Sequence, residues 1–122
     1  MIYFSTEHFW LRVAEDGRSA VAGITQHAQE TLGDIVFVEL PRLEHFEQNR
    51  AVGLVESAKT ASDLFMPVAA RVVEVNTELA EQPELLNNDP LGAGWIFRVE
   101  DLQTAQLAGL MDETAYAEFA GG

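Results

Sequence analysis

The stretch GLVESAKTASDLFMPV, residues 53–68, contains Lys59, the single lysine of a chain whose other basic side chains are arginines. Arginine would serve equally well as a surface cation, but only lysine offers a primary amine that an enzyme can acylate. The neighbouring side chains are small and leave that amine accessible: Ser57, Ala58, Thr60 and Ala61. We interpret Lys59 as a candidate attachment point for an acyl group. The alternative is a drift of the composition toward arginine with one lysine remaining.

The composition narrows the class of protein. With 122 residues, 48% of them hydrophobic and 7 of them phenylalanine, the chain is expected to form one domain, residues 1–122, around a modest core. A formal net charge of -13 argues against nucleic acid or an anionic membrane surface as a partner and favours proteins with basic docking faces. The sequence has no cysteine, which excludes a thiol nucleophile, a disulfide and a thiolate metal site.

The sequence also disfavours a secreted protein, a membrane protein and an enzyme. The first residues, MIYFSTEHFW, lack a basic segment followed by an apolar core, and no apolar run approaches the length of a membrane span. We therefore expect a cytoplasmic protein. The histidines His8, His27 and His45 are scattered, and no residues form a catalytic constellation, so neither a metal site nor catalysis is expected.

The pattern of apolar residues predicts a mainly β fold with short helices. Two apolar runs around Asp16-Gly17 indicate a hairpin within residues 9–24, and Thr25 and Gly33 are expected to begin and end a short helix. Further strands are expected at residues 34–41, 50–57, 65–76 and 95–100, with a helical turn at 83–90 and one or two amphipathic helices within 103–119. Short strands separated by turns are typical of a barrel or a sandwich.

The position of the lysine follows from this pattern. Residues 58–63, AKTASD, lie between two expected strands and are polar and short enough to form a tight exposed turn with Lys59 near its tip. Val68, Val73 and Val75 are candidate core residues of the strand that follows. A lysine that is modified by one enzyme and then visits others should project from such a rigid turn.

The residues around Lys59 form a motif, Glu56-Ser57-x-Lys59-x-x-Ser62-Asp63. Together with GITQHAQETLGDIVFVELP before it and PVAARVVEVN, PELLNNDP and GWIFRV after it, the chain resembles the H protein of the glycine cleavage system. The resemblance runs from about Phe9 to Val99 and continues weakly to TAYAEF. It implies a barrel-sandwich hybrid fold related to lipoyl and biotinyl domains, with a C-terminal helical segment.

The resemblance also implies a function. Lys59 would carry lipoate in amide linkage, attached by a lipoate ligase or lipoyl transferase that reads Glu56, Ser57, Ser62 and Asp63. The protein would be a carrier and not an enzyme, moving an aminomethyl group between the glycine-cleavage decarboxylase, the aminomethyltransferase and dihydrolipoyl dehydrogenase. Lipoate is favoured over biotin because biotinyl lysines typically stand between methionines, whereas Ala58 and Thr60 flank Lys59.

One departure from the family lies where the amine of the loaded arm is held. The aspartate of the motif is present as Asp63, but the glutamate of the family's His-Glu-Trp run is replaced in His8-Phe9-Trp10. Glu7 is a candidate replacement, since strand alternation would place residues 7 and 9 on one face. The expected arm cleft is therefore Glu7, Phe9 and Asp63. Two smaller departures are Ala70, where the family usually has glycine, and the connection 42–50, which lacks the family's glycine.

Two alternative functions stay open. A cleft without the amine-holding glutamate suits the lipoate-binding relatives of H proteins, which are associated with a heterodisulfide-reductase-like complex and carry sulfur. The terminal pair Gly121-Gly122 is also the signature of ubiquitin-like sulfur carriers, although two terminal glycines are more often a frayed end.

Overall fold

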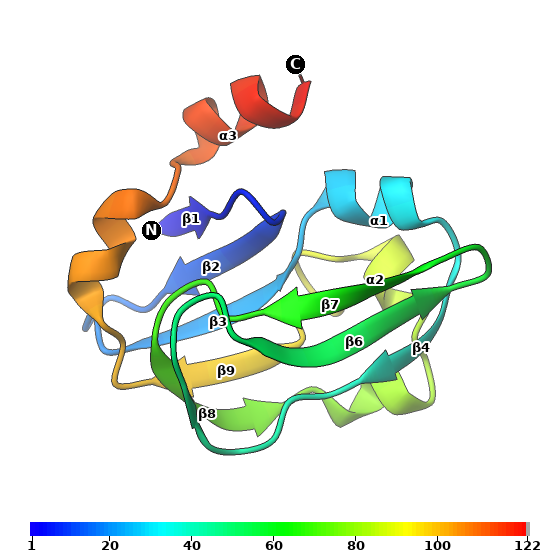
Figure 1. The fold of residues 1–122 in the computed structure, drawn as a ribbon, viewed down its shortest axis with the longest axis horizontal. Coiled ribbons are helices and arrows are strands. Elements are labelled where there is room, and N and C mark those ends of the chain that lie inside the picture. The colour runs from blue at the N-terminus through cyan, green and yellow to red at the C-terminus, as the bar shows by residue number, and fades with distance from the viewer. Residues whose placement is uncertain (122) are drawn as a thin grey trace.

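The computed structural model describes residues 1–121 as two antiparallel sheets with short helices at their edges, so the predicted mainly β class with a C-terminal helix is confirmed (Figure 1). Gly122 of the terminal glycine pair lies outside the described residues. Six strands form the larger sheet in the order β1 (Ile2–Phe4), β2 (Phe9–Val13), β3 (Ser19–Ile24), β9 (Phe97–Glu100), β8 (Ala70–Val75) and β5 (His45–Phe46). The smaller sheet has the order β4 (Ile35–Glu39), β6 (Ala51–Ser57) and β7 (Ala61–Phe65).

Short helices connect the strands. They are α1 (Gln26–Leu32), α2 (Leu85–Asn88), α3 (Glu113–Gly121) and the 3-10 helices η1 (Thr77–Ala80) and η2 (Thr104–Gly109). The predicted boundaries of α1 are confirmed, because the Thr25 hydroxyl accepts the Ala28 N–H at 3.2 Å and Gly33 ends the helix at φ 86°. Within residues 1–121, no helix is long and apolar enough to cross a membrane.

The core fills the space between the two sheets. Alternate residues of the paired strands point into it, and the most deeply buried include Leu11, Val55, Leu64 and Phe97. The smaller sheet lies across one face of the larger one in Figure 1, and the hairpin β6–β7 extends beyond it. The core thereby holds the base of this hairpin, and the tip lies outside the core.

The prediction of one strand over residues 65–76 is wrong. The chain leaves the smaller sheet after Phe65 and enters the larger one at Ala70, and residues 66–69 form a buried crossing between them. The backbone of this crossing is satisfied locally, since Asn49 N–H donates to the Met66 carbonyl at 2.8 Å. Ala70 and Val72 are the core residues of β8, at 0% and 1% exposure, while Val73 is only half-buried because the register of β8 shifts between residues 72 and 74.

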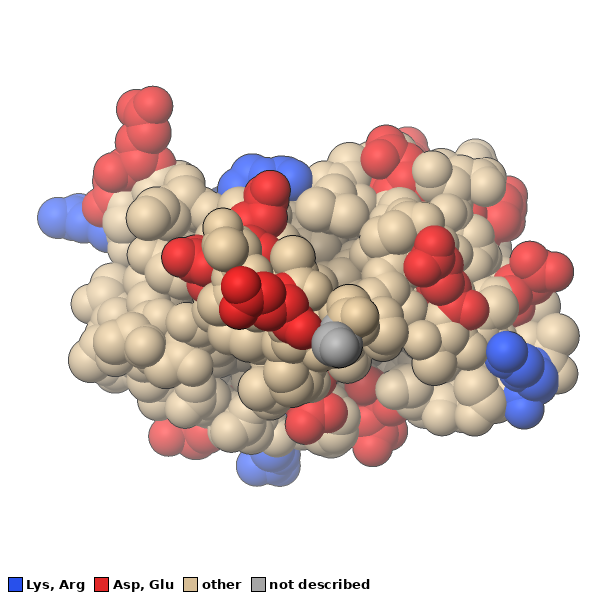
Figure 2. Space-filling model, turned by 90° about the horizontal axis from the view of Figure 1, so that it is seen from above, with Lys and Arg blue, Asp and Glu red and all other residues tan. Residues whose placement is uncertain are grey.

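The surface is acidic and its charges are largely unpaired. Within residues 1–121 the ion pairs are Arg98 with Glu74 at 2.9 Å, Arg98 with Glu100 at 3.3 Å and His45 with Glu47 at 3.6 Å. Figure 2 shows carboxylates spread over the face seen from above, while the few Lys and Arg side chains stand near its rim. The net charge of -13 is therefore presented to solvent and to partners.

Candidate functional site

Lys59 lies in the turn of the β6–β7 hairpin, as the sequence predicts, but the turn is shorter than expected. Strand β6 ends at Ser57 and β7 begins at Ala61, so residues 58–60 make the whole connection. Residues 61–63, which the sequence assigned to the turn, belong to β7. The shorter turn leaves Lys59 fewer backbone conformations, because both neighbouring strands hold it.

The Ser57 side chain shapes this turn from within. The residue is 8% exposed, and its N–H and hydroxyl both donate to the Thr60 carbonyl, at 2.7 and 3.1 Å. Its oxygen accepts the N–H groups of Lys59 at 3.3 Å and Thr60 at 3.1 Å. A serine hydroxyl that bonds nearby backbone groups in this way fixes a turn. The structure therefore gives Ser57 a conformational role.

The turn also rests on the end of α1. The Ala58 N–H donates to the Asp34 carbonyl at 3.1 Å. Gly33 lies beneath the lysine stem, since a Cβ atom added there would stand 3.4 Å from Lys59 Cε. Asn87 of α2 holds this segment in turn, because its amide donates to the Gly33 carbonyl at 2.8 Å and its oxygen accepts the Ile35 N–H at 2.9 Å. Lys59 thus projects from a fixed base.

The Lys59 amine is available for chemistry. Its side chain is exposed, and within residues 1–121 no carboxylate forms an ion pair with it. A primary amine without a partner can be acylated without first breaking a salt bridge. Acylation would remove the positive charge and convert the side chain into a longer apolar arm.

The other motif residues lie on two faces of the smaller sheet. Glu56 of β6 pairs with Ala61, and Asp63 of β7 pairs with Leu54, and both carboxylates point away from the core. Ser62 is exposed but belongs to the row of Val38 and Val55, which faces the core. Glu56 and Asp63 are therefore presented together on the outer face, on either side of the lysine along the chain.

Asp63 lines a surface depression of about 690 Å³ on this outer face. The other lining residues mix acidic, basic and apolar side chains and include Glu39, Arg42, Phe46, Arg50 and Leu54. Neither Glu7 nor Phe9 is among the lining residues. The structure thus brings only one of the three residues of the expected arm cleft to this depression.

The argument that placed Glu7 and Phe9 on one face of a strand is wrong. Strand β2 begins at Phe9, and residue 7 lies in the preceding turn, where His8 takes the left-handed conformation at φ 67°. Glu7 is exposed, whereas Phe9 is 3% exposed and packs edge-on against Phe65 with ring centroids 6.4 Å apart. Side chains alternate between the two faces of a sheet only within a continuous strand, so this rule cannot place Glu7 and Phe9 on one face.

The two smaller departures from the family have structural explanations. Ala70 opens β8 opposite Phe46, and within residues 1–121 it is not among the positive-φ residues, so no glycine is needed there. In the connection before β6, Asn49 adopts φ 66°. Asparagine tolerates the left-handed region better than most side chains, so it can supply the conformation for which glycine is usually chosen.

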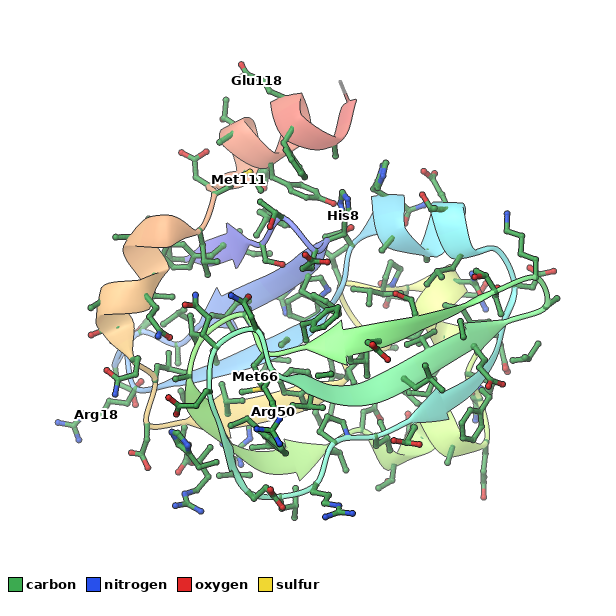
Figure 3. All side chains as sticks on the ribbon, in the orientation of Figure 1. His8, Arg18, Arg50, Met66, Met111 and Glu118 are labelled. Carbon is green, nitrogen blue, oxygen red and sulfur yellow. The ribbon has the colours of Figure 1, made fainter. Side chains whose placement is uncertain are left out.

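A polar cluster that sequence reasoning missed joins three distant segments. His8 Nδ1 lies 2.7 Å from the Tyr116 hydroxyl, which lies 2.7 Å from Thr25 Oγ1, and the His8 ring stacks on His27 at 4.4 Å. Figure 3 shows His8 where the β1–β2 connection meets α1 and α3. Burial lowers the pKa of His8, His27 lowers it further and Glu7 opposes them. No local spacing in the sequence signals these contacts, because the residues that make them are up to 108 positions apart.

The fold defines the class of protein. A glycine cleavage system H protein from Mycobacterium marinum has a similar solved structure, with a TM-score of 0.88 and 35% identity over 99% of this chain and 97% of that chain. Two sheets around one core, with the lysine hairpin at one end, are the lipoyl-domain-like barrel-sandwich fold, so the predicted fold class is confirmed.

The sequence comparisons define the family. The family model described as Glycine cleavage H-protein matches residues 2–121. Glycine cleavage system H proteins from Symbiobacterium thermophilum and Chromobacterium violaceum are 50% and 51% identical, covering 95% and 93% of this chain and 90% and 89% of their own lengths. The chain belongs to the glycine cleavage H-protein family.

Proposed function

We propose that the protein carries lipoate on Lys59 and moves an aminomethyl group between the enzymes of glycine cleavage. The observation that carries the proposal is the exposed side chain of Lys59 at the tip of a hairpin, in a member of this family. Ser57 holds the backbone of this turn through the N–H groups of Lys59 and Thr60. The partners would be a lipoate ligase or lipoyl transferase, the decarboxylase, the aminomethyltransferase and dihydrolipoyl dehydrogenase. The protein itself would be their substrate and not a catalyst.

The residues around Lys59 fit a lipoyl group. The attachment chemistry needs an unpaired primary amine, and Gly33 leaves open the space that a side chain would fill beside the Lys59 stem. When attached, the lipoyl group supplies a dithiolane that accepts and releases the transferred unit. The sequence of this chain offers no thiol of its own, because it has no cysteine.

The chain contributes presentation and steering. The β6–β7 hairpin, Ser57 and the end of α1 fix the base of the arm, so the arm explores a limited volume around the tip. Tethering raises the effective concentration of the arm at each enzyme that docks. The unpaired carboxylates favour approach by basic surfaces.

An alternative function is that the arm carries sulfur to a heterodisulfide-reductase-like complex. The argument for this alternative comes from the residue at position 9. Phe9 lies in the core where glycine-cleavage relatives would place an amine-holding glutamate, and Glu7 is exposed in a turn. Asp63 is then the remaining acidic residue of the expected cleft, and it lines the depression beside Arg50.

A mass measurement separates the two cargoes. After incubation of the lipoylated protein with glycine and a glycine-cleavage decarboxylase, an aminomethyl adduct on the Lys59 peptide supports glycine cleavage. An unloaded arm, beside a control H protein that loads, favours sulfur.

The attachment point is tested by Lys59→Arg. The variant should fold as the wild type does, because the side chain is exposed and unpaired, and should gain no lipoyl mass, because a guanidinium is not acylated. We expect complete loss of carrier function with a melting temperature within about 2 °C of wild type. A folded Lys59→Arg protein that still supports glycine cleavage would contradict the proposal.

A further inference from the structure

The outer face of the smaller sheet carries an aromatic side chain next to the lysine turn. Phe37 of β4 pairs with Glu56 of β6, and Glu56 pairs with Ala61 of β7. These three residues form the row nearest the turn that points away from the core, and we call it the outer row. Phe37 is 49% exposed, an unusual position for a phenylalanine that could have joined the core.

A β-bulge turns this ring outward. The register between β4 and β6 shifts between Ile35, which pairs with Ser57, and Phe37, so Val36 is an extra residue. Both Val36, at 57% exposure, and Phe37 consequently leave the core, while Ile35 and Val38 on either side are buried. Without the shift, alternation would send Phe37 inward and Val38 outward. Bulges are known to re-aim side chains next to functional sites.

An enzyme that docks around Lys59 is expected to cover this row. A specific interface buries roughly 800 Å² on each partner, which corresponds to a disc of about 16 Å radius. Glu56 is three residues from Lys59 along the chain, and a fully extended chain spans at most about 3.6 Å per residue, so Glu56 of the outer row lies within about 11 Å of the Lys59 backbone. Phe37 therefore falls inside the surface that such an enzyme occupies, and aromatic side chains are enriched among the residues that dominate interface energies.

The charges around Phe37 specify the chemistry of the partner. Glu39, Glu56 and Asp63 are exposed on the same outer face, and none of them is in an ion pair within residues 1–121. A complementary surface would have an apolar pocket for the ring with basic side chains at its rim. Glu56 and Asp63 are also the carboxylates that the sequence motif predicts for enzyme recognition, so the ring and the motif share one face.

We propose that Phe37, together with Val36, is the apolar anchor by which the lipoate-attaching enzyme docks on this protein. The inference rests on the proposed attachment at Lys59 and names a contact that the motif does not contain. In the step that docking permits, the neutral Lys59 amine attacks the carbonyl of a lipoyl-adenylate. The carbon–nitrogen bond forms, the carbon–oxygen bond to the phosphate breaks, AMP leaves and the amine proton passes to solvent.

The test compares Phe37→Thr with Leu43→Thr in the unlipoylated full chain. Leu43 is 62% exposed and precedes β5, away from the lysine turn, so it controls for loss of an exposed apolar side chain. With purified lipoate ligase, lipoate and ATP, the gain of lipoyl mass at Lys59 gives KM and kcat, and a biosensor without ATP gives Kd. For Phe37→Thr we expect KM and Kd to rise about tenfold with kcat within about twofold. For Leu43→Thr neither should change by more than about twofold.

Further variants keep the outcome interpretable. Threonine suits a strand, so Phe37→Thr should melt near wild type, and Phe37→Tyr should restore most of the affinity because it keeps the ring. Equal KM and Kd for Phe37→Thr and Leu43→Thr would overturn the inference. The inference would also be overturned if Phe37→Thr weakened binding to the decarboxylase but not to the lipoate ligase. The proposed function fails separately, if the wild type gains no lipoyl mass at all.

Discussion

At the scale of single residues, Phe9 decides what chemistry the region beside the lysine hairpin can offer. The ring is 3% exposed and is surrounded by core side chains, including Phe65 of the lysine-bearing hairpin. A buried ring can pack and exclude water, but it cannot hold an ammonium group as a carboxylate does. The sequence alone suggests that Phe9→Glu would rebuild an amine-holding cleft. The burial of Phe9 changes that expectation.

We predict that Phe9→Glu destabilises the fold. A glutamate at this position would bury a carboxyl group in an apolar site without a hydrogen-bond or charge partner, which costs about 3 kcal/mol or more of unfolding free energy. Phe9→Leu is the matched control and should cost about 1 to 2 kcal/mol, since it removes only part of the packing. Urea unfolding followed by circular dichroism measures both. If Phe9→Glu is as stable as Phe9→Leu and also retains the aminomethyl group longer, position 9 reaches the cleft after all.

At the scale of elements, α3 is held mainly by one side chain. Tyr116 is the buried residue of α3, and its ring stacks on Phe4 at 4.6 Å while its hydroxyl meets His8 and Thr25. The network closes when Thr25 donates to Tyr116 and Tyr116 donates to neutral His8. Burial raises the pKa of Tyr116 above its ordinary value, and the Thr25 hydrogen bond opposes this. The packing of α3 therefore favours neutral forms of both rings.

This network predicts a pH dependence of stability. The folded-state pKa of His8 lies below its ordinary value of 6.5, so the unfolded chain binds the proton first as the pH falls. The contribution of neutral His8 is present above pH 6.5 and is lost as the pH falls below it. His8→Asn removes the titrating ring but tolerates φ 67°. Thermal melts from pH 7.5 to 5.5 should show a larger fall in Tm for wild type than for His8→Asn. Parallel curves would contradict the assignment.

The order of elements was predictable where each has a local signal. The hairpin at Gly17, the capped helix α1 and strands β4, β6 and β9 follow from turn residues, a cap and apolar runs. Strand β7 was missed because its exposed residues, Ala61 to Asp63, are small or polar and read as a turn. The crossing at 66–69 was missed because it is buried, so its apolar residues read as a continuous strand.

The candidate site was predictable to a similar degree and for similar reasons. Lys59 and its motif are contiguous in the sequence, so the proposed attachment point and its turn could be located without a structure. The exposure of Phe37 could not, because only the bulge between Ile35 and Phe37 turns the ring outward. The contacts of His8 with Tyr116 likewise depend on packing between the two ends of the chain. Sequence reasoning therefore located the candidate lysine and its turn but not the side chains that surround them.

At the scale of the whole molecule, the charge distribution and the hairpin act together. The net charge of -13 is spread over the surface with few internal ion pairs, so the field extends into solvent and attracts basic partners from any direction. The carboxylates on the outer face, Glu56 and Asp63, would then act at short range beside the lysine. Long-range attraction accelerates the encounter, and local contacts fix its orientation.

The distinction between long-range attraction and local contacts predicts how salt and single charges affect docking. The association rate of the unlipoylated protein with its lipoate-attaching enzyme should fall about tenfold between about 20 and 300 mM salt, because screening shortens the range of the field. Glu56→Gln should lower both the rate and its salt slope. The matched control Glu118→Gln removes the same charge from α3, where the side chain points into solvent (Figure 3), and should lower the rate less.

Stopped-flow measurements across the salt series give both slopes. Equal effects of the two variants would mean that only the net charge matters, and a rate independent of salt would mean that the acidic surface does not steer this partner at all.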